Sequence, residues 1–156
     1  MSKWVSWTTP IAVVVSAGSA AHAIQYLSIP EAQRRAFPAA SNFAVVQPDR
    51  IWRAEAGGRA IGFFIFDRVI GKHLYIDYSV ALDTSGRIRQ VDILQYRESY
   101  GGEIRSPSWL AQFVGKSSAS ALQIGNDIRN ISGATLSSHH VTEGVKRIMG
   151  IANRLK

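Results

Sequence analysis

A threonine hydroxyl among small residues is the group in this chain best placed to take part in chemistry. It lies in the stretch Ser132-Gly133-Ala134-Thr135-Leu136-Ser137-Ser138. Gly133 allows a turn that a bulkier residue would strain, and Ala134 leaves the hydroxyl of Thr135 uncovered. Apolar residues then recur at helical spacing: Val141, Val145, Ile148, Met149, Ala152 and Leu155. Because the start of a helix offers free amide groups and the positive end of a dipole, the stretch is a candidate phosphate site. The alternative is that Ser137 or Ser138 simply caps the helix.

Two motifs of the chain resemble the FMN-binding domain family. The first is Ser-Gly-Ala-Thr followed by Ser-Ser, at residues 132–138. The second is Tyr96-Arg97-Glu98-Ser99-Tyr100-Gly101-Gly102-Glu103-Ile104, continued by Trp109, Gln112, Phe113, Gly115 and Lys116. It resembles the family's glycine-containing loop and the aromatic-rich helix that follows. The motifs occur in the family's order, and the resemblance runs from about Tyr26 onward. The family includes subunits of Rnf-type and sodium-pumping NADH:quinone reductases and small exported FMN-binding proteins.

The resemblance implies that the chain carries FMN, esterified through its phosphate to a threonine by a separate flavin transferase. The matching position is Thr135. The residues expected around the phosphate are Ser132, Gly133, Ala134, Leu136, Ser137 and Ser138. The chain departs from the family at one position, because many signatures have an aspartate three residues before the serine, where this chain has Arg129. Asp127 lies two residues further upstream. If the transferase reads that aspartate, the alternative is FMN held without a covalent bond.

The glycine-containing motif implies the residues around the flavin ring. Gly101 and Gly102 would let the backbone approach a flat ligand, with a plain hairpin turn as the alternative. Tyr100 and Trp109 are candidates to border the isoalloxazine, with a place in the core as the alternative. Glu98 and Glu103 are candidate hydrogen-bond acceptors for the flavin or its ribityl chain, and the alternative is a solvated charge.

Two arginines of the same region are candidates for tuning the flavin. We expect Arg97 or Arg105 beside the ring to stabilise the negative charge of a reduced flavin and raise its potential. The sequence predicts no metal site, because the pair His139-His140 lacks a spaced set of further ligands. We expect these two histidines to face solvent in the first turn of the last helix.

The composition narrows the classes of function. With 156 residues, 46% of them hydrophobic, the chain fits one folded domain. The absence of cysteine excludes iron–sulfur clusters, cysteine-attached haem and thiol redox chemistry, so an organic cofactor must carry any electrons. The net charge is +7, but the basic residues are scattered and no nucleic-acid motif accompanies them. We therefore expect an anionic partner protein, a membrane surface or the flavin phosphate, and no nucleic acid.

The first 23 residues are expected to be an export signal. Lys3 supplies a positive charge, Pro10 to Ala17 form an apolar stretch, and Ala21-His22-Ala23 offers small residues at a cleavage site. The alternative is an uncleaved membrane anchor from about Trp4 to Ile24. The domain boundaries are then 1–23 for the leader and 24–156 for the FMN-binding domain. The expected location is the periplasm or the outer face of the cytoplasmic membrane.

The remaining pattern predicts an α+β domain with a central antiparallel β-sheet packed against helices. Strands are expected at 43–47, 51–54, 61–70, 75–82 and 87–95, the last three as a meander. In the fourth, Ile76, Tyr78 and Val80 share a face, and in the fifth Ile88, Gln90, Asp92 and Leu94 alternate against Arg89, Val91 and Ile93. Helices are expected at 30–36, behind a capping box at Ser28, at 109–114, and from about 137 to the C-terminus. Residues 119–124 fit a strand or a helical turn.

The sequence therefore leads to an exported flavoprotein that carries electrons between redox partners. The expected partners are a membrane-bound electron-transfer complex or a cytochrome, with a flavin transferase for maturation. No substrate pocket, nicotinamide site or general acid–base pair is recognisable, which favours an electron-transfer protein or oxidoreductase subunit over a self-sufficient enzyme. The alternatives are a sensing or interaction module with non-covalent FMN and no electron relay, and an exported structural protein without a cofactor.

Overall fold

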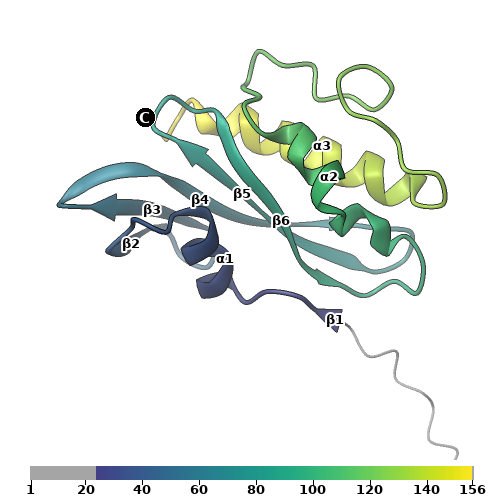
Figure 1. Ribbon diagram of the computed structural model, residues 1–156, viewed down its shortest axis with the longest axis horizontal. Coiled ribbons are helices and arrows are strands. Elements are labelled where there is room, and N and C mark those ends of the chain that lie inside the picture. The colour runs from purple at the N-terminus through teal and green to yellow at the C-terminus, as the bar shows by residue number, and fades with distance from the viewer. Residues whose placement is uncertain (1–23, 156) are drawn as a thin grey trace, which may run out of the picture.

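A six-stranded antiparallel sheet with helices on both faces forms the protein, as seen in a computed structural model that describes residues 24–155 (Figure 1). The expected α+β architecture is confirmed. The strand order is β1-β6-β5-β4-β3-β2. The strands are β1 (Ile24–Gln25), β2 (Asn42–Gln47), β3 (Ile51–Ala56), β4 (Arg59–Ile70), β5 (Tyr75–Asp83) and β6 (Ile88–Tyr96). The predicted export signal lies outside the described residues.

The two faces of the sheet bury separate apolar clusters. On one face Ile76, Tyr78 and Val80 are fully buried beneath α3 (Thr135–Ala152), as their alternation predicts. On the other face Phe64, Ala81 and Leu94 pack against α1 (Ile29–Ala36). Figure 1 shows α1 on one side of the sheet and α2 and α3 on the other.

The predicted alternation of the last strand is confirmed from Val91 to Leu94 but is wrong at Ile88, which shares a face with Val91 and Ile93. Ile88, Val91, Ile93 and Tyr96 all belong to the cluster under α3, whereas Leu94 faces α1. The cause is a pair of register shifts between β5 and β6, one between Ala81 and Leu82 and one between Asp77 and Tyr78. Each β-bulge adds one residue to a strand and reverses the face of every side chain beyond it.

The helices begin and end close to their expected positions. The capping box of α1 is present, since Ser28 and Glu31 each accept from the other's backbone amide. The last helix begins at Thr135, two residues before the expected start, and ends at Ala152. The expected helix at 109–114 is a short α2 (Pro107–Leu110) followed by a 3₁₀ helix, η2 (Ala111–Phe113). A second 3₁₀ helix, η1 (Gly102–Arg105), precedes them. Residues 119–124 form neither a strand nor a helical turn.

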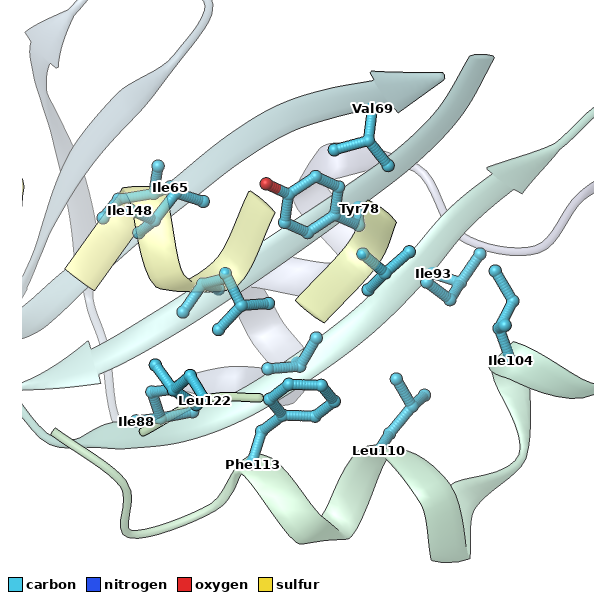
Figure 2. Close-up of a cluster of buried hydrophobic side chains, with 14 of the residues drawn as sticks. Ile65, Val69, Tyr78, Ile88, Ile93, Ile104, Leu110, Phe113, Leu122 and Ile148 are labelled. Carbon is cyan, nitrogen blue, oxygen red and sulfur yellow. The ribbon is translucent and has the colours of Figure 1, made fainter. Parts of the chain in front are cut away.

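The core under α3 joins the sheet to the short helices. In Figure 2 Val69 and Tyr78 project from the strands toward α3, and Leu110 and Phe113 reach the same cluster from the α2–η2 segment. The aromatic rings of Trp109 and Phe113 meet edge to face, with centroids 5.2 Å apart. This packing fixes the segment that borders the site described below. Among residues 24–155, no helix has the length and apolar character needed to span a membrane.

Asp77 makes the most extensive ion pairing on the face opposite α3. Its carboxylate lies 2.8 Å from Arg68 Nε and 2.9 Å from Arg97 Nη2. Burial by itself raises the pKa of Asp77, but the hydrogen bonds from Arg97 and Arg68 outweigh it and hold this pKa below its usual value. Since the pKa is lowered in the folded state, the stabilisation is present above the pKa of the unfolded chain, about 3.9. It is lost as the pH falls through the folded value.

We expect Asp77→Asn to lower the free energy of unfolding at pH 7 by about 1–3 kcal/mol, because a buried charged acceptor is removed from two guanidinium groups. The loss relative to the wild type should shrink as the pH falls below about 3.9. Urea unfolding at several pH values measures both. Asp49→Asn, at an exposed turn, is the control and should show no such pH dependence. A loss that stays constant down to strong acid would contradict the assignment.

Candidate functional site

The main pocket of the described residues lies between two loops and α2. Its volume is about 1590 Å³, larger than the roughly 300–1,000 Å³ usual for ligand pockets. One wall is the loop from Tyr96 through Arg105, and another is the segment from Arg129 to Ser132. The remaining lining residues are Tyr26, Ser106, Pro107, Ser108, Trp109 and Gln112. The pocket therefore joins the two motifs that the sequence singled out.

Thr135 is exposed at the first residue of α3, three positions beyond the pocket wall at Ser132. The side-chain amide of Asn130 donates to its Oγ1 over 3.3 Å. Ala134 is the N-cap and makes no side-chain capping bond. By helix geometry the first N–H groups of α3 have no intrahelical acceptor, so they are available to an anion beside Thr135.

Ser137 and Ser138 lie inside the first turn and face the protein interior. Ser138 Oγ donates to the carbonyl of Ala134 over 2.8 Å, and Thr142 Oγ1 donates to the carbonyl of Ser138 over 2.7 Å. Ser137 Oγ lies 3.3 Å from the hydroxyl of Tyr96. The alternative interpretation, in which one of these serines is the helix cap, is therefore wrong. As both are buried, they do not line the pocket.

Three glycines of the motifs, Gly101, Gly102 and Gly133, have different surroundings. Gly133 has a φ of +84° and nothing within 4 Å of an added Cβ, so its role is conformational. Gly101 has a φ of +90°, and a Cβ there would lie 2.6 Å from Tyr96 Oη and 3.5 Å from Ala134 Cβ. It is a close-packing glycine that brings the pocket loop against the start of α3. Gly102 borders the pocket and has open space around it, which fits the expected approach of a flat ligand.

Alanine at Gly101 and at Gly102 should have different effects on stability, because only Gly101 is closely packed. Gly101→Ala is expected to destabilise the protein by about 1–3 kcal/mol, because the added methyl meets a buried hydroxyl and the backbone is left-handed. Gly102→Ala is expected to change the free energy of unfolding by no more than about 0.5 kcal/mol. Thermal unfolding of the two apoproteins measures this. Equal melting temperatures would contradict the packing role of Gly101.

The acidic residues of the loop have unequal environments. Glu98 Oε1 accepts from the backbone amides of His73 and Leu74, over 2.5 and 2.7 Å, and so holds the β4–β5 turn. Burial raises the pKa of Glu98, but these amide hydrogen bonds outweigh it and leave the pKa below its usual value. Glu103 is exposed at the pocket wall. The structure thus gives Glu98 a structural role that sequence reasoning missed, whereas Glu103 is free to meet a ligand.

The two aromatic candidates border the pocket in different ways. Tyr100 is 88% exposed, so its ring is available to cover a ligand. Trp109 is 5% exposed, packs on Phe113, and donates from Nε1 to the carbonyl of Arg129 over 2.7 Å. Trp109 is therefore both a core residue and part of the pocket wall. Its hydrogen bond fixes the segment 129–132 against α2.

The arginines expected beside the ring also differ. Both guanidinium Nη atoms of Arg97 donate to the carboxylate of Asp77, which also pairs with Arg68, so this guanidinium is already engaged. Arg105 is exposed, lines the pocket and lies 4.5 Å above the ring of Tyr26, without a carboxylate partner among the described residues. Of the two arginines, Arg105 is therefore the one whose guanidinium is free of a carboxylate within residues 24–155 and able to meet a ligand in the pocket.

Asp127 does not take the place of the aspartate that many family signatures have at the position of Arg129. The carboxylate of Asp127 accepts from the amides of Leu122 and Gln123 and pairs with Lys116 over 3.3 Å. It therefore shapes its own loop and does not reach the threonine. Arg129 itself is exposed at the pocket wall.

Several pocket residues had no role assigned from the sequence. Tyr26 follows β1, and its spacing from the motifs gives no hint that it joins them. Asn130 was not singled out, although its neighbour Arg129 was.

His140, expected to face solvent, is half-buried, and its Nδ1 lies 2.6 Å from the carbonyl of Ile70, so that nitrogen must carry the proton. Within residues 24–155, no cluster of three or more histidine or acidic residues could hold a metal.

The residues around the pocket fit a flavin mononucleotide. The pocket is large enough, and an exposed aromatic ring and a glycine with open space around it border it. The uncapped start of α3, with an exposed threonine, lies three residues beyond the pocket wall and suits a phosphate.

Comparison with known proteins gives a family for this chain. The family model described as "FMN-binding domain" matches residues 71–150. The solved structure of NqrC from Shewanella oneidensis is similar at 17% identity and a TM-score of 0.49, over 83% of this chain and 75% of that chain. None of the curated proteins compared with the chain matches it. Since the matched residues span half of the chain and contain both motifs of the pocket, the chain belongs to the FMN-binding domain family.

Proposed function

We propose that this protein is an exported electron carrier whose FMN is joined by its phosphate to Thr135. The observation that carries the proposal is the position of this threonine, exposed at the uncapped start of α3 and next to a pocket of flavin size. The phosphoester would form when Oγ1 loses its proton and attacks the flavin-side phosphorus of a flavin dinucleotide held by a separate transferase. The bond from that phosphorus to the bridging oxygen breaks, and a nucleoside monophosphate leaves. An exposed loop of small residues suits such a reaction, since a second protein must reach the hydroxyl.

The bound flavin would supply the one- and two-electron chemistry. The residues of this chain orient and tune it. The first amides of α3 would hold the phosphate, and Tyr100 and Gly102 would border the ring. Arg105 would favour extra negative charge in the pocket, which raises a reduction potential. The open pocket suits exchange of electrons with a partner protein, and the proposed partners are a cytochrome or a membrane-bound electron-transfer complex.

The proposal is tested by co-expression with a flavin transferase and export to the periplasm, followed by intact-mass analysis under denaturing conditions. The expected result is a mature chain that begins at Ile24 and carries the mass of one FMN less one water. Reduction with dithionite and reoxidation by an added cytochrome should then bleach and restore the flavin absorbance. A colourless protein would overturn the proposal.

One observation favours a second form of the proposal, in which the FMN is held without a covalent bond. Arg129 replaces the aspartate of many family signatures, and Asp127 is engaged elsewhere. In this form the purified protein is yellow, but denaturation releases all of the flavin and the chain keeps its unmodified mass. The same mass measurement therefore decides between the two forms.

A further inference from the structure

Tyr96 lies where the last strand meets the pocket loop, and its hydroxyl joins three parts of the fold. It is the final residue of β6, is 4% exposed, and belongs to the core cluster under α3. Its ring also lines the pocket. The hydroxyl donates to the carbonyl of Tyr100 and lies 3.3 Å from Ser137 Oγ. A buried hydroxyl with two partners is well satisfied, so the contacts are expected to hold one geometry.

The loop after Tyr96 folds back tightly over this hydroxyl. Gly101 lies so close that a Cβ would be 2.6 Å from Tyr96 Oη and 3.4 Å from Ser137 Oγ. The left-handed backbone of Gly101 turns the loop at this point. The carbonyl of Tyr100 and the backbone of Gly101 are thus held against the first turn of α3.

The first turn of α3 is fixed on its other side. The hydroxyls of Ser138 and Thr142 bond to carbonyls one turn earlier, so the turn that carries Thr135 is tied to the body of the helix. Ser137 lies two residues after Thr135, and its hydroxyl donates to Tyr96 Oη, whose own proton goes to the carbonyl of Tyr100. The Tyr96 hydroxyl is therefore the link between the loop that borders the ring and the helix end that carries the threonine.

We propose that Tyr96 is a positioning residue of the flavin site: its hydroxyl fixes the separation between the Tyr100–Gly102 wall and Thr135. This inference rests on the proposed function, because it takes the Tyr100–Gly102 wall as the part that borders the flavin ring and Thr135 as the part that holds the phosphate. A flavin tethered by its phosphate keeps its ring in one orientation only if the wall is held in place. Tyr96 provides that constraint without touching the reacting atoms.

The test compares Tyr96→Phe with Tyr78→Phe in the full chain. Each variant removes one buried hydroxyl, and Tyr78, whose hydroxyl donates to Asp67 over 3.1 Å, does not line the pocket. In Tyr96→Phe we expect amide hydrogen exchange of residues 100–102 in the apoprotein to accelerate, by up to about tenfold for one lost hydrogen bond. In the flavin-loaded protein we expect a changed visible circular dichroism spectrum and a shifted reduction potential. Tyr78→Phe should leave all three readouts unchanged.

Ser137→Ala keeps the hydrogen bond from the Tyr96 hydroxyl to the carbonyl of Tyr100 and removes only the contact between Tyr96 and α3. It should reproduce the change in dichroism while leaving the exchange of residues 100–102 closer to the wild type. Unchanged exchange and dichroism in Tyr96→Phe would overturn the inference, and so would equal changes in Tyr78→Phe. A wild-type protein that takes up no flavin would overturn the proposed function and with it the flavin-site role, whereas the exchange data would still report whether the hydroxyl fixes the loop.

Discussion

Thr135→Ala should abolish covalent attachment of the flavin completely, because the alanine has no oxygen to form the phosphoester. The pocket keeps its lining residues, since Thr135 lies outside the lining, and only Asn130 loses a hydrogen-bond acceptor, Thr135 Oγ1. We therefore expect residual, dialysable FMN in the variant and none that survives denaturation. Intact-mass analysis and absorbance before and after unfolding measure the two pools.

Two controls make this result specific. Thr84→Ala removes an exposed threonine from the β5–β6 turn, which also continues with serine and glycine, and should leave attachment at the wild-type level. Thermal unfolding of apo Thr135→Ala should show a change of no more than about 0.5 kcal/mol, as is usual for an exposed position. A covalent flavin retained by Thr135→Ala would show that another residue holds it.

Gly144→Ala should destabilise the protein by about 1–3 kcal/mol, although alanine is the better helix former. A Cβ at this position would lie 2.7 Å from Val69 Cγ1 and closer still to the hydroxyl of Tyr78. Tyr78 has no room to withdraw, because it is fully buried and its hydroxyl is held by Asp67, which also pairs with Arg147 over 2.7 Å. The helix would therefore have to move away from the sheet.

Gly150 provides the matched control on the same helix. Nothing lies within 4 Å of a Cβ there, so Gly150→Ala should stabilise the protein by about 0.5–1 kcal/mol through helix propensity alone. Adding Tyr78→Phe to Gly144→Ala removes the nearest clashing atom, and the double variant should be less destabilised than the sum of the single ones. Urea unfolding measures all four. A Gly144→Ala variant as stable as the wild type would contradict this account of the packing.

The sequence by itself determined the local structure around the threonine. Helical spacing after residue 140 follows from burial of one face of α3. The shared face of Ile76, Tyr78 and Val80 follows from the two-residue period of a strand, although β5 is buried on both faces. The Ser-Gly-Ala-Thr stretch could be assigned to an exposed turn at a helix start because its residue types allow little else. The absence of cysteine excluded iron–sulfur clusters, cysteine-attached haem and thiol redox chemistry in the same direct way.

Only the tertiary structure decided which residues surround the site. The Tyr96 and Ser137 hydroxyls are 41 residues apart in the chain, and their contact depends on how α3 packs on the sheet. Two bulges place Ile88 on the same face as Val91, and Tyr96 on the same face as Ile93, which alternation does not reveal. Gly101 and Gly102 look alike in the sequence. The Tyr96 hydroxyl leaves no room for a side chain at Gly101, however, whereas Gly102 borders open space. Such differences arise from contacts between distant segments, which residue type and spacing do not encode.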